Sequence, residues 1–433
     1  MIFAKSSDSD FNTKFKELLE RGKMDIEHVS LIVSDIINEI KRDKNTALKK
    51  HITKFDNWTP MDDEDLKIPT DLMSKAYKNL DEKLKSALHL AYNRIKIYHE
   101  KQKPKSWFDT ENNGTILGQK VTAVDSAGLY IPGGKAAYPS SLLMNVIPAQ
   151  VAGVDNIVIC TPTPDNEPNK LLLAACHLCG VSEVYKVGGA SAIAAMAYGT
   201  QTIPKVDVIT GPGNIFVATA KKMVFGEVNI DMIAGPSEIG ILADESANAS
   251  HLAIDLLSQS EHDEMASSIL ITQSQALADK VKIEIENWLV KLPREKIARK
   301  SIEDRGAIIV TKDMDEAIRL MNEIAPEHLE VATKSPFELL PFIKHAGAIF
   351  LGHNTPEAIG DYIAGPNHTL PTGGTAKFYS PLGVENFMKK TSIISFSNLA
   401  INEIGEECAL IAKTESLTAH EQSVRVRLKK PNK

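Results

Sequence analysis

Short runs of β-branched residues alternate with segments of helical periodicity from about Val121 onward, and this alternation constrains the fold more than any other feature. The strand-like runs are Asn156–Cys160, Val184–Val187, Val206–Thr210, Ile239–Leu242, Ile269–Thr272, Ala307–Val310 and Ala348–Leu351. The helical stretches between them lie near 140–152, 168–179, 190–199, 213–225, 249–263, 275–291 and 313–324. Because parallel strands are joined by helical crossovers, this alternation predicts an α/β fold with parallel sheets covered by helices on both faces.

The chain is too long, at 433 residues, to be built around one ordinary core. The number of strand–helix units predicts two doubly wound, incomplete Rossmann-like parallel-sheet domains, with small helical or extended segments at both ends of the chain. Glycine-rich seams at Gly133-Gly134 and Gly235-Pro236 bracket the first of these domains. The expected boundaries are 1–24 for an N-terminal helical segment, 25–130 with 236–381 for one α/β domain, 131–235 for the α/β domain inserted into it, and 382–433 for a C-terminal lid, small domain or arm.

The composition is that of a soluble globular protein, with 43% hydrophobic and 24% charged residues. A formal net charge of -7 argues against a general nucleic-acid binder, and no apolar run is long enough to cross a bilayer or to form a signal peptide. Four cysteines are too few for a disulfide scaffold, so we expect a reducing cytoplasm. Cys176 and Cys179 have a metal-like spacing, but their apolar helical surroundings and the lack of a second cysteine pair favour buried structural thiols.

Gln259 and His262 are three residues apart on an expected helix that follows the strand Ile239–Leu242, so their side chains share one face. A histidine nitrogen and an amide oxygen can both bind a borderline divalent ion. Ligands of open α/β sheets often lie at the carboxyl ends of the strands, and we expect this pair near such an end. Taken alone, the spacing also fits a solvated helix end.

Glu327 and His328 are adjacent, follow a helical stretch and lead into a short strand at Leu329–Thr333. A carboxylate beside an imidazole suits proton transfer near neutral pH, although a strand-edge glutamate and a fully bonded histidine would leave the same pattern. Asp361 and His368 lie in a loop rich in Gly and Pro. In such a constrained loop Asp361 could ligate a metal and His368 could orient a ligand.

Three glycine clusters flank the expected strands or open the expected helices, and their backbones could approach an anionic ligand closely. They are Gly128–Gly134, Gly188–Ser191 and Gly211–Asn214. None forms the dinucleotide fingerprint G-x-G-x-x-G, because Phe216 occupies the last position after Gly211 and Gly213. The clusters alone therefore predict anion-tolerant loops and no particular cofactor.

Seven segments, in this order along the chain, closely resemble the histidinol dehydrogenase family. They are GLYIPGG at 128–134, GPGN at 211–214, AGPSE at 234–238, DLLSQ-x-EH at 255–262, PEHLE at 326–330, GDYIAGPNHTLPTGG at 360–374 and LTAH at 417–420. The resemblance covers the chain from about 120 to its end. It implies the four-electron oxidation of L-histidinol through L-histidinaldehyde to L-histidine with two NAD molecules, which forms the last steps of histidine biosynthesis.

The resemblance also implies which residues act. The implied ligands of one zinc ion per subunit are Gln259, His262, Asp361 and His420, and the implied catalytic pair is Glu327 and His328. The implied substrate contacts are Ser237, Gln259, His262, His328, Asp361, Glu415 and His420, and the implied NAD contacts are Tyr130, Ser191 and Asn214. Ser191 stands where the family usually has Gln, so this chain departs from the family at that contact.

In the resembled family the segment that corresponds to LTAH, with His420, comes from a partner subunit. The implied active unit is therefore a homodimer, in which His420 and Glu415 complete the partner's site. The inserted domain at 131–235 would bind NAD, the domain at 25–130 with 236–381 would hold zinc and the catalytic pair, and 382–433 would be the dimer arm.

Other functions remain open on the residues alone. A related dehydrogenase could oxidise another small alcohol, such as a sulfonated diol, although Glu415 beside His420 favours an imidazole-bearing substrate. A zinc hydrolase could use Glu327 as a base toward metal-bound water. A non-catalytic binding module would not need the complete ligand set. Turnover that depends on NAD separates the dehydrogenases from the hydrolase.

Overall fold

The computed structural model describes residues 1–21, 27–133 and 138–428. It divides the chain into two compact units, Met1–Gln102 with Val124–Phe387 and Lys103–Ala123 with Met388–Lys433. Gly134, which belongs to one of the predicted glycine-rich seams, lies outside the described residues. Within the described ranges, no helix combines the length and the apolar character needed to cross a membrane.

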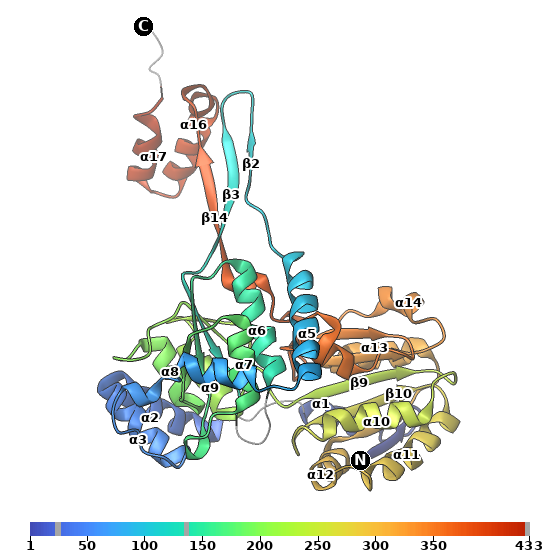
Figure 1. Cartoon of the computed structure of the whole chain (residues 1–433). Helices are drawn as coiled ribbons and strands as arrows, with labels where there is room; N and C mark the ends of the chain where they lie inside the picture. Colours follow the sequence, from blue (N-terminus) through green and yellow to red (C-terminus); the bar gives the residue numbers. More distant parts are fainter. Residues whose placement is uncertain (22–26, 134–137, 429–433) are drawn as a thin grey trace. The chain divides into compact units, whose positions relative to one another are not determined.

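The first unit contains a six-stranded sheet in which all paired strands are parallel. In spatial order its strands are β1 (Ile2–Lys5), β11 (Ala307–Val310), β10 (Ser267–Thr272), β9 (Glu238–Ala243), β12 (His328–Ala332) and β13 (Ala348–Leu351). One face packs against α10 (Ala249–Ser260), α11 (Gln275–Leu289) and α12 (Glu295–Arg305), and the other against α1 (Phe11–Arg21) and α13 (Met314–Ile324) (Figure 1). Alternate residues of β10 point to opposite faces of the sheet. Leu270 therefore packs in the core with α10, whereas Ile269 and Ile271 pack in the core with α13.

A second parallel sheet, with five strands, lies in the same unit. In spatial order its strands are β6 (Glu183–Tyr185), β5 (Asn156–Cys160), β4 (Ser126–Tyr130), β7 (Val208–Thr210) and β8 (Asn229–Ile230). The helices that pack on it or beside it are α2 (Glu27–Asp43), α3 (Asn45–Phe55), α4 (Thr70–Lys78), α5 (Glu82–Glu100), α6 (Pro139–Ala152), α7 (Lys170–Cys179), α8 (Gly189–Tyr198) and α9 (Ile215–Val224).

Both sheets have the same doubly wound order. Apart from β1, which lies at the edge of the six-stranded sheet, the chain starts each sheet with β4 or β9, adds two strands outward on one side, and then returns to the other side with β7 or β12. The point where the order reverses lies between β4 and β7 in one sheet and between β9 and β12 in the other. In open α/β sheets this reversal leaves a crevice between neighbouring loops where ligands commonly bind.

The predicted α/β class with two doubly wound parallel sheets is confirmed, because each strand-like run overlaps a strand and each helical stretch overlaps a helix. The first 130 residues are divided between the two sheets in a way that differs from the expected boundaries. β1 is a strand of the six-stranded sheet, and β4 is the central strand of the five-stranded sheet, against which α2 and α3 also pack. β1 is too short to show a period, and its partner β11 begins only at Ala307, so nothing local in the sequence identifies it.

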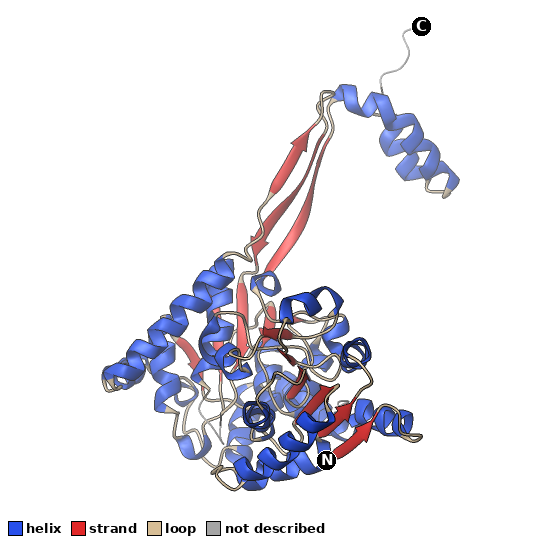
Figure 2. Cartoon of the chain, turned by 90° about the vertical axis from the view of Figure 1, so that its right-hand side faces the viewer, coloured by secondary structure: helices blue, strands red, loops and turns tan. Residues whose placement is uncertain are grey.

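The second unit is an antiparallel sheet with two helices. Its strands, in the order β14 (Met388–Ser395), β3 (Ile116–Ala123) and β2 (Trp107–Thr110), join the C-terminal part of the chain to a segment from before β4 (labelled in Figure 1). Figure 2 shows these strands in red, with loops and helices connected to them. Helices α16 (Asn398–Thr414) and α17 (Thr418–Arg425) pack against each other. The predicted C-terminal segment 382–433 therefore lacks the two strands that Lys103–Ala123 contributes.

A buried ion pair supports the glycine-rich loop that follows β7. Lys221 on α9 and Asp231 after β8 form a salt bridge with side chains that are 2% and 0% exposed. Lys221 Nζ donates to the carbonyl oxygen of Gly211, and Asp231 Oδ2 accepts from the N–H of Gly211, both at 2.9 Å. Gly211 has φ +116°, and a Cβ there would lie 2.0 Å from the Tyr130 carbonyl oxygen, so only glycine fits.

Replacing Lys221 with Met is expected to lower the free energy of unfolding by about 3–5 kcal/mol, because Asp231 would remain charged and buried without its partner. Urea unfolding followed by circular dichroism measures the change. Lys222, the exposed neighbour on the same helix, provides the control, since Lys222→Met should alter the free energy by less than about 0.5 kcal/mol. A Lys221→Met protein as stable as this control would show that the ion pair does not support the loop.

Candidate active site

The expected catalytic pair and three of the four expected metal ligands, Gln259, His262 and Asp361, meet at the amino edge of the six-stranded sheet. Glu327 and His328 stand at the start of β12, and Ser237 directly precedes β9. Helix α10 begins beyond the carboxyl end of β9 and runs back along the sheet for about 18 Å, close to the length of the strand, so Gln259 and His262 return to the amino edge. The prediction that this pair lies near a carboxyl end was wrong, because the helix carries it across the sheet.

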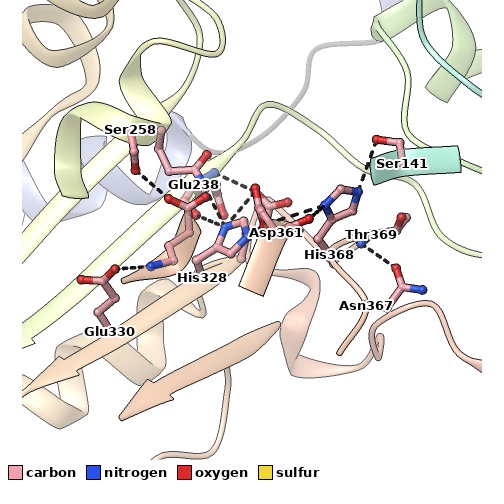
Figure 3. Close-up of polar contacts among 12 residues, drawn as sticks. Ser141, Glu238, Ser258, His328, Glu330, Asp361, Asn367, His368 and Thr369 are labelled. Atoms are coloured by element: carbon pink, nitrogen blue, oxygen red, sulfur yellow. Dashed lines mark hydrogen bonds and ion pairs between the residues drawn. The ribbon is translucent and has the colours of Figure 1, made fainter. Parts of the chain in front are cut away.

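The imidazole of His328 is buried and fixed from both sides (Figure 3). Its Nδ1 lies 3.1 Å from the carbonyl oxygen of Glu238 and 3.2 Å from Nε2 of Gln259, and its Nε2 lies 3.3 Å from Oδ1 of Asp361. Burial alone would lower the pKa of His328, but the carboxylates of Glu327 and Asp361 outweigh burial and raise it to about 10. Ring orientation and charge at this position are therefore both set by surrounding groups.

Glu327 is buried beside His328 and close to a second buried carboxyl group, that of Glu238. Oε2 of Glu327 accepts the N–H of Glu238 at 2.8 Å and lies 3.7 Å from Nδ1 of His328. Burial raises the pKa of Glu327 to about 7. Burial and the charge of Glu327 raise the pKa of Glu238, which accepts the N–H of Gly373 at 3.1 Å, to about 8. Glu327 thus titrates in the neutral range, as a general base requires.

Asp361 lies in a five-residue π-helical turn, η4 (Gly360–Ala364). Turns of this kind are frequent at functional sites. The backbone carbonyl of Asp361 is 2.9 Å from Nδ1 of His368, whose Nε2 is 3.3 Å from Oγ of Ser141 at the start of α6 (Figure 3). Burial opposes ionisation of Asp361, but the hydrogen bond from His328 and the charge of His368 hold its pKa below its usual range. His368 thus contacts the backbone of Asp361, and its role in orienting a ligand stays a prediction.

Gln259 and His262 have the properties of metal ligands. Gln259 is fully buried, and while its Nε2 contacts His328, its Oε1 has no hydrogen-bond partner among the described residues. A buried amide oxygen without a partner is costly unless something else binds it. Burial lowers the pKa of His262, which favours the neutral imidazole that a metal needs. The amide, imidazole and carboxylate groups of Gln259, His262 and Asp361 therefore fit a borderline cation such as zinc.

Glu357 is a site residue that the sequence did not single out. Among the described acidic, histidine and cysteine side chains, those of His328, Glu357 and Asp361 offer ligand atoms within 4.8 Å of one another, a spacing that could also hold a cation. Burial raises the pKa of Glu357 to about 8, and its Oε2 accepts from Oγ of Ser258 at 2.6 Å. The one available signal was the four-residue spacing to Asp361, which places both side chains on one face of a helical turn.

A cavity of about 1030 Å³ opens at this edge of the sheet. His328, Asp361 and His368 line one part of it, and Tyr98 and Gln102 on and after α5 line another. Its volume lies at the upper end of the range of small-molecule sites. His328 of the expected catalytic pair and Asp361 of the expected metal ligands therefore face a space large enough for a substrate.

The residues expected to contact NAD lie at the carboxyl edge of the five-stranded sheet, around the crevice between β4 and β7. Tyr130 ends β4, and its hydroxyl accepts the N–H of Gly189 at 3.2 Å. Asn214 is exposed, and its side chain caps the amino end of α9. Ser191 is buried, and its Oγ lies 2.8 Å from Nδ1 of His51. The role of Ser191 toward NAD stays a prediction.

Glu415 and His420 belong to the second unit. Glu415 directly follows α16, His420 lies on α17, and both side chains are exposed. They line a groove of about 730 Å³ together with the apolar side chains of Ile404, Ile411 and Leu417.

The cysteines do not contribute a nucleophile to the site. Cys160, Cys176 and Cys179 are buried free thiols, as predicted for Cys176 and Cys179, and burial raises the pKa of all three. Raised pKa values disfavour the reactive thiolate. Cys408 is exposed on α16 in the second unit.

Comparisons with known proteins identify the family of the chain. The family model described as histidinol dehydrogenase matches residues 19–428. Histidinol dehydrogenase of Sulfurimonas denitrificans is 83% identical over 99% of this chain and 100% of its own length, and that of Wolinella succinogenes is 67% identical over 98% of both. The crystal structure of histidinol dehydrogenase from Elizabethkingia anophelis has a TM-score of 0.93 and 35% identity, covering 99% of this chain and 98% of its own.

Proposed function

The chain belongs to the histidinol dehydrogenase family, and from that membership we propose a zinc- and NAD-dependent active site centred on Glu327 and His328. The reaction of the family is the four-electron oxidation of L-histidinol through L-histidinaldehyde to L-histidine at the end of histidine biosynthesis, so the chain is an oxidoreductase. The observation that best supports the zinc site is the Gln259 amide, whose nitrogen is bound to His328 while its buried oxygen has no described partner.

The proposed zinc ligands are Gln259, His262 and Asp361 of one subunit and His420 of the partner subunit. When bound, zinc orients the substrate by its amine and imidazole nitrogens, and NAD accepts one hydride in each oxidation. The mixed nitrogen and oxygen donors of these four side chains suit zinc. Ser237, beside the site before β9, and Glu415 of the partner subunit complete the proposed substrate contacts.

His328 is the proposed base in both oxidations. It accepts the alcohol proton in the first step and a proton from the hydrated aldehyde in the second, so it must be neutral when substrate binds. Asp361 and Glu327 favour its protonated form. With zinc held at Asp361, the charge of that carboxylate would be offset and the pKa of His328 would fall toward the working range.

Glu327 is the proposed base that activates water between the two oxidations. Its Oε2 is anchored by the N–H of Glu238, which leaves Oε1 as the oxygen that takes the proton of the water. The hydroxyl group adds to the aldehyde carbon, and the resulting hydrated aldehyde is the substrate of the second oxidation. A pKa of about 7 lets Glu327 accept and release this proton in the neutral range.

The proposed NAD site lies at the crevice between β4 and β7, where Tyr130 and Asn214 stand beside glycine-rich loops. His368 contacts Ser141 at the start of α6, the helix that follows the loop after β4, so the two expected sites are joined through this pair of residues.

The proposed homodimer is supported by the surface of the second unit. Large apolar side chains are exposed on its strands and helices, among them Trp107, Phe108, Ile394, Leu410 and Ile411. Soluble monomers rarely expose so many apolar side chains together, which favours a protein partner over this surface. A second copy of this chain would cover this surface with the same segments, and these segments carry Glu415 and His420.

The overall reaction predicts two reduced cofactors for each histidine formed. Absorbance at the reduced-nicotinamide band and amino-acid analysis measure the two products in one assay. Prior removal of metal with a chelator should abolish turnover, and added zinc should restore it. Turnover without NAD would favour the zinc hydrolase instead.

Glu327→Gln is expected to slow oxidation of the aldehyde by about 10²–10⁴-fold while slowing oxidation of the alcohol much less, because only the aldehyde step needs activated water. Since ionised Glu327 is the active form, the rate of the wild-type aldehyde step should rise with pH through an apparent pKa near 7, and the variant should lose this rise. Glu338→Gln, at an exposed position on α14 (Pro336–Leu339), is the control. Equal losses in both half-reactions would contradict the assignment.

A shared site predicts complementation between two inactive proteins. His420→Asn and His262→Asn homodimers should both be inactive, because every site lacks one ligand. After mixing and exchange, heterodimers contain one site with both histidines, so activity should return to at most about one quarter of the wild-type value. Proven heterodimers without activity would contradict a site built from two subunits.

A further inference from the structure

Two acidic residues belong to recognisable sequence segments but have no place in the proposed reaction. Asp255 opens the segment DLLSQ on α10, one helical turn before Gln259. Glu330 ends the segment PEHLE on β12, two residues after His328, and is 4% exposed. Their side chains form a hydrogen bond with each other. The fold therefore brings together two carboxyl groups that are distant in the sequence.

The pair forms the second of two matching cross-links between α10 and β12. The helix runs antiparallel to the strand, so that Gln259 meets His328 and Asp255 meets Glu330. Four helical residues span about 6 Å and two strand residues about 6.6 Å, so both contacts form at the same time. His328 and Glu330 share the sheet face that packs against α10, because the alternate residues Leu329 and Val331 lie in the opposite core.

A third element is tied to the same pair. Oε1 of Glu330 accepts the N–H of Glu357 at 2.7 Å, at the start of the turn that leads to Asp361 (Figure 3). The carboxyl group of Glu357 in turn accepts from Oγ of Ser258 on α10 at 2.6 Å. The Asp255–Glu330 pair therefore connects α10, β12 and the turn from Glu357 to Asp361, which are the three elements bearing the site residues of this unit.

We propose that Asp255 and Glu330 are positioning residues, which set the spacing of Gln259, His328 and Asp361 and thereby the affinity of the site for its cation. The proposal rests on the zinc site proposed above. It gives Glu330 two simultaneous bonds, one donated to Asp255 and one accepted from the N–H of Glu357. A neutral carboxyl group can donate and accept at once, whereas a carboxylate can only accept.

The charge states of the pair are consistent with this arrangement. Burial, with the neighbouring charge of Asp255, raises the pKa of Glu330 well above its usual value. Burial also raises the pKa of Asp255, to about 6, while the hydrogen bond from Glu330 and the charge of His251 act in the opposite direction. At neutral pH Glu330 is therefore the donor and Asp255 the acceptor.

The test compares two substitutions of Glu330 that have nearly the same size. Glu330→Gln keeps a donor for Asp255 and an acceptor for the N–H of Glu357, whereas Glu330→Met removes both. The full-length protein is stripped of metal, and its zinc dissociation constant is measured by competition with a chromophoric chelator. We expect Glu330→Met to weaken zinc binding about 10–100-fold, as for other residues that orient metal ligands. Glu330→Gln should stay within about threefold of the wild type.

Two further variants keep the test decisive. Asp255→Ala, at a half-buried position, removes the same cross-link with less disturbance of the core and should also weaken zinc binding about 10–100-fold, so it decides the outcome should Glu330→Met fail to fold. Glu245→Ala, which removes an exposed carboxyl group from the loop before α10, is the matched control and should bind zinc like the wild type. The melting temperature of each metal-free protein separates a weaker site from a weaker fold.

Two results would overturn the inference. One is zinc binding equal to the wild type in folded Glu330→Met or Asp255→Ala protein. The other is an equal loss of affinity in Glu330→Gln and Glu330→Met, which would show that the hydrogen bonds of Glu330 do not matter. Wild-type protein that binds no zinc would instead refute the proposed zinc site, so the two failures are distinguishable.

Discussion

The arrangement of the site depends on how the imidazole of His328 is held at the amino edge of the six-stranded sheet. The ring contacts a carbonyl oxygen of β9, an amide of α10 and a carboxylate of η4. Each contact comes from a different part of the chain, and each fixes a group that the proposed reaction uses. Of these three groups, the Gln259 amide can contact His328 through its nitrogen and still present an oxygen to a cation. The same Gln259 side chain therefore fixes both the orientation of the proposed base, His328, and the position of one proposed metal ligand atom.

The two parallel sheets use opposite edges although their strand order is the same. The expected NAD contacts follow the usual rule and lie beyond the carboxyl ends of β4 and β7. The residues of the proposed proton transfer, Glu327 and His328, instead lie at the start of β12. This reversal follows from α10, which is about as long as β9 and so delivers its last residues to the amino edge. Glu327 and Glu238 are buried at this edge, and burial raises the pKa of both carboxyl groups.

Local signals in the sequence predicted most of the fold and part of the site. Strands such as Ile269–Thr272 are buried on both faces and read as continuous apolar runs, and adjacent residues such as Glu327 and His328 remain together in any fold. Pairings between distant segments were not predictable, because β1 with β11 or Asp255 with Glu330 leave no local pattern. The zinc ligands were assigned by family resemblance, since the spacing of Gln259 and His262 alone also fits a solvated helix end.

The central claim is that the cation binds at Gln259, His262 and Asp361 and not at the neighbouring cluster of His328, Glu357 and Asp361. A crystal structure of the zinc-loaded enzyme, with anomalous diffraction measured at the zinc edge, locates the ion directly. Zinc at the proposed site would give one strong peak per subunit within about 2.0–2.2 Å of Oε1 of Gln259 and of a ring nitrogen of His262. A peak bound by His328 and Glu357, with the Gln259 oxygen left free, would contradict it.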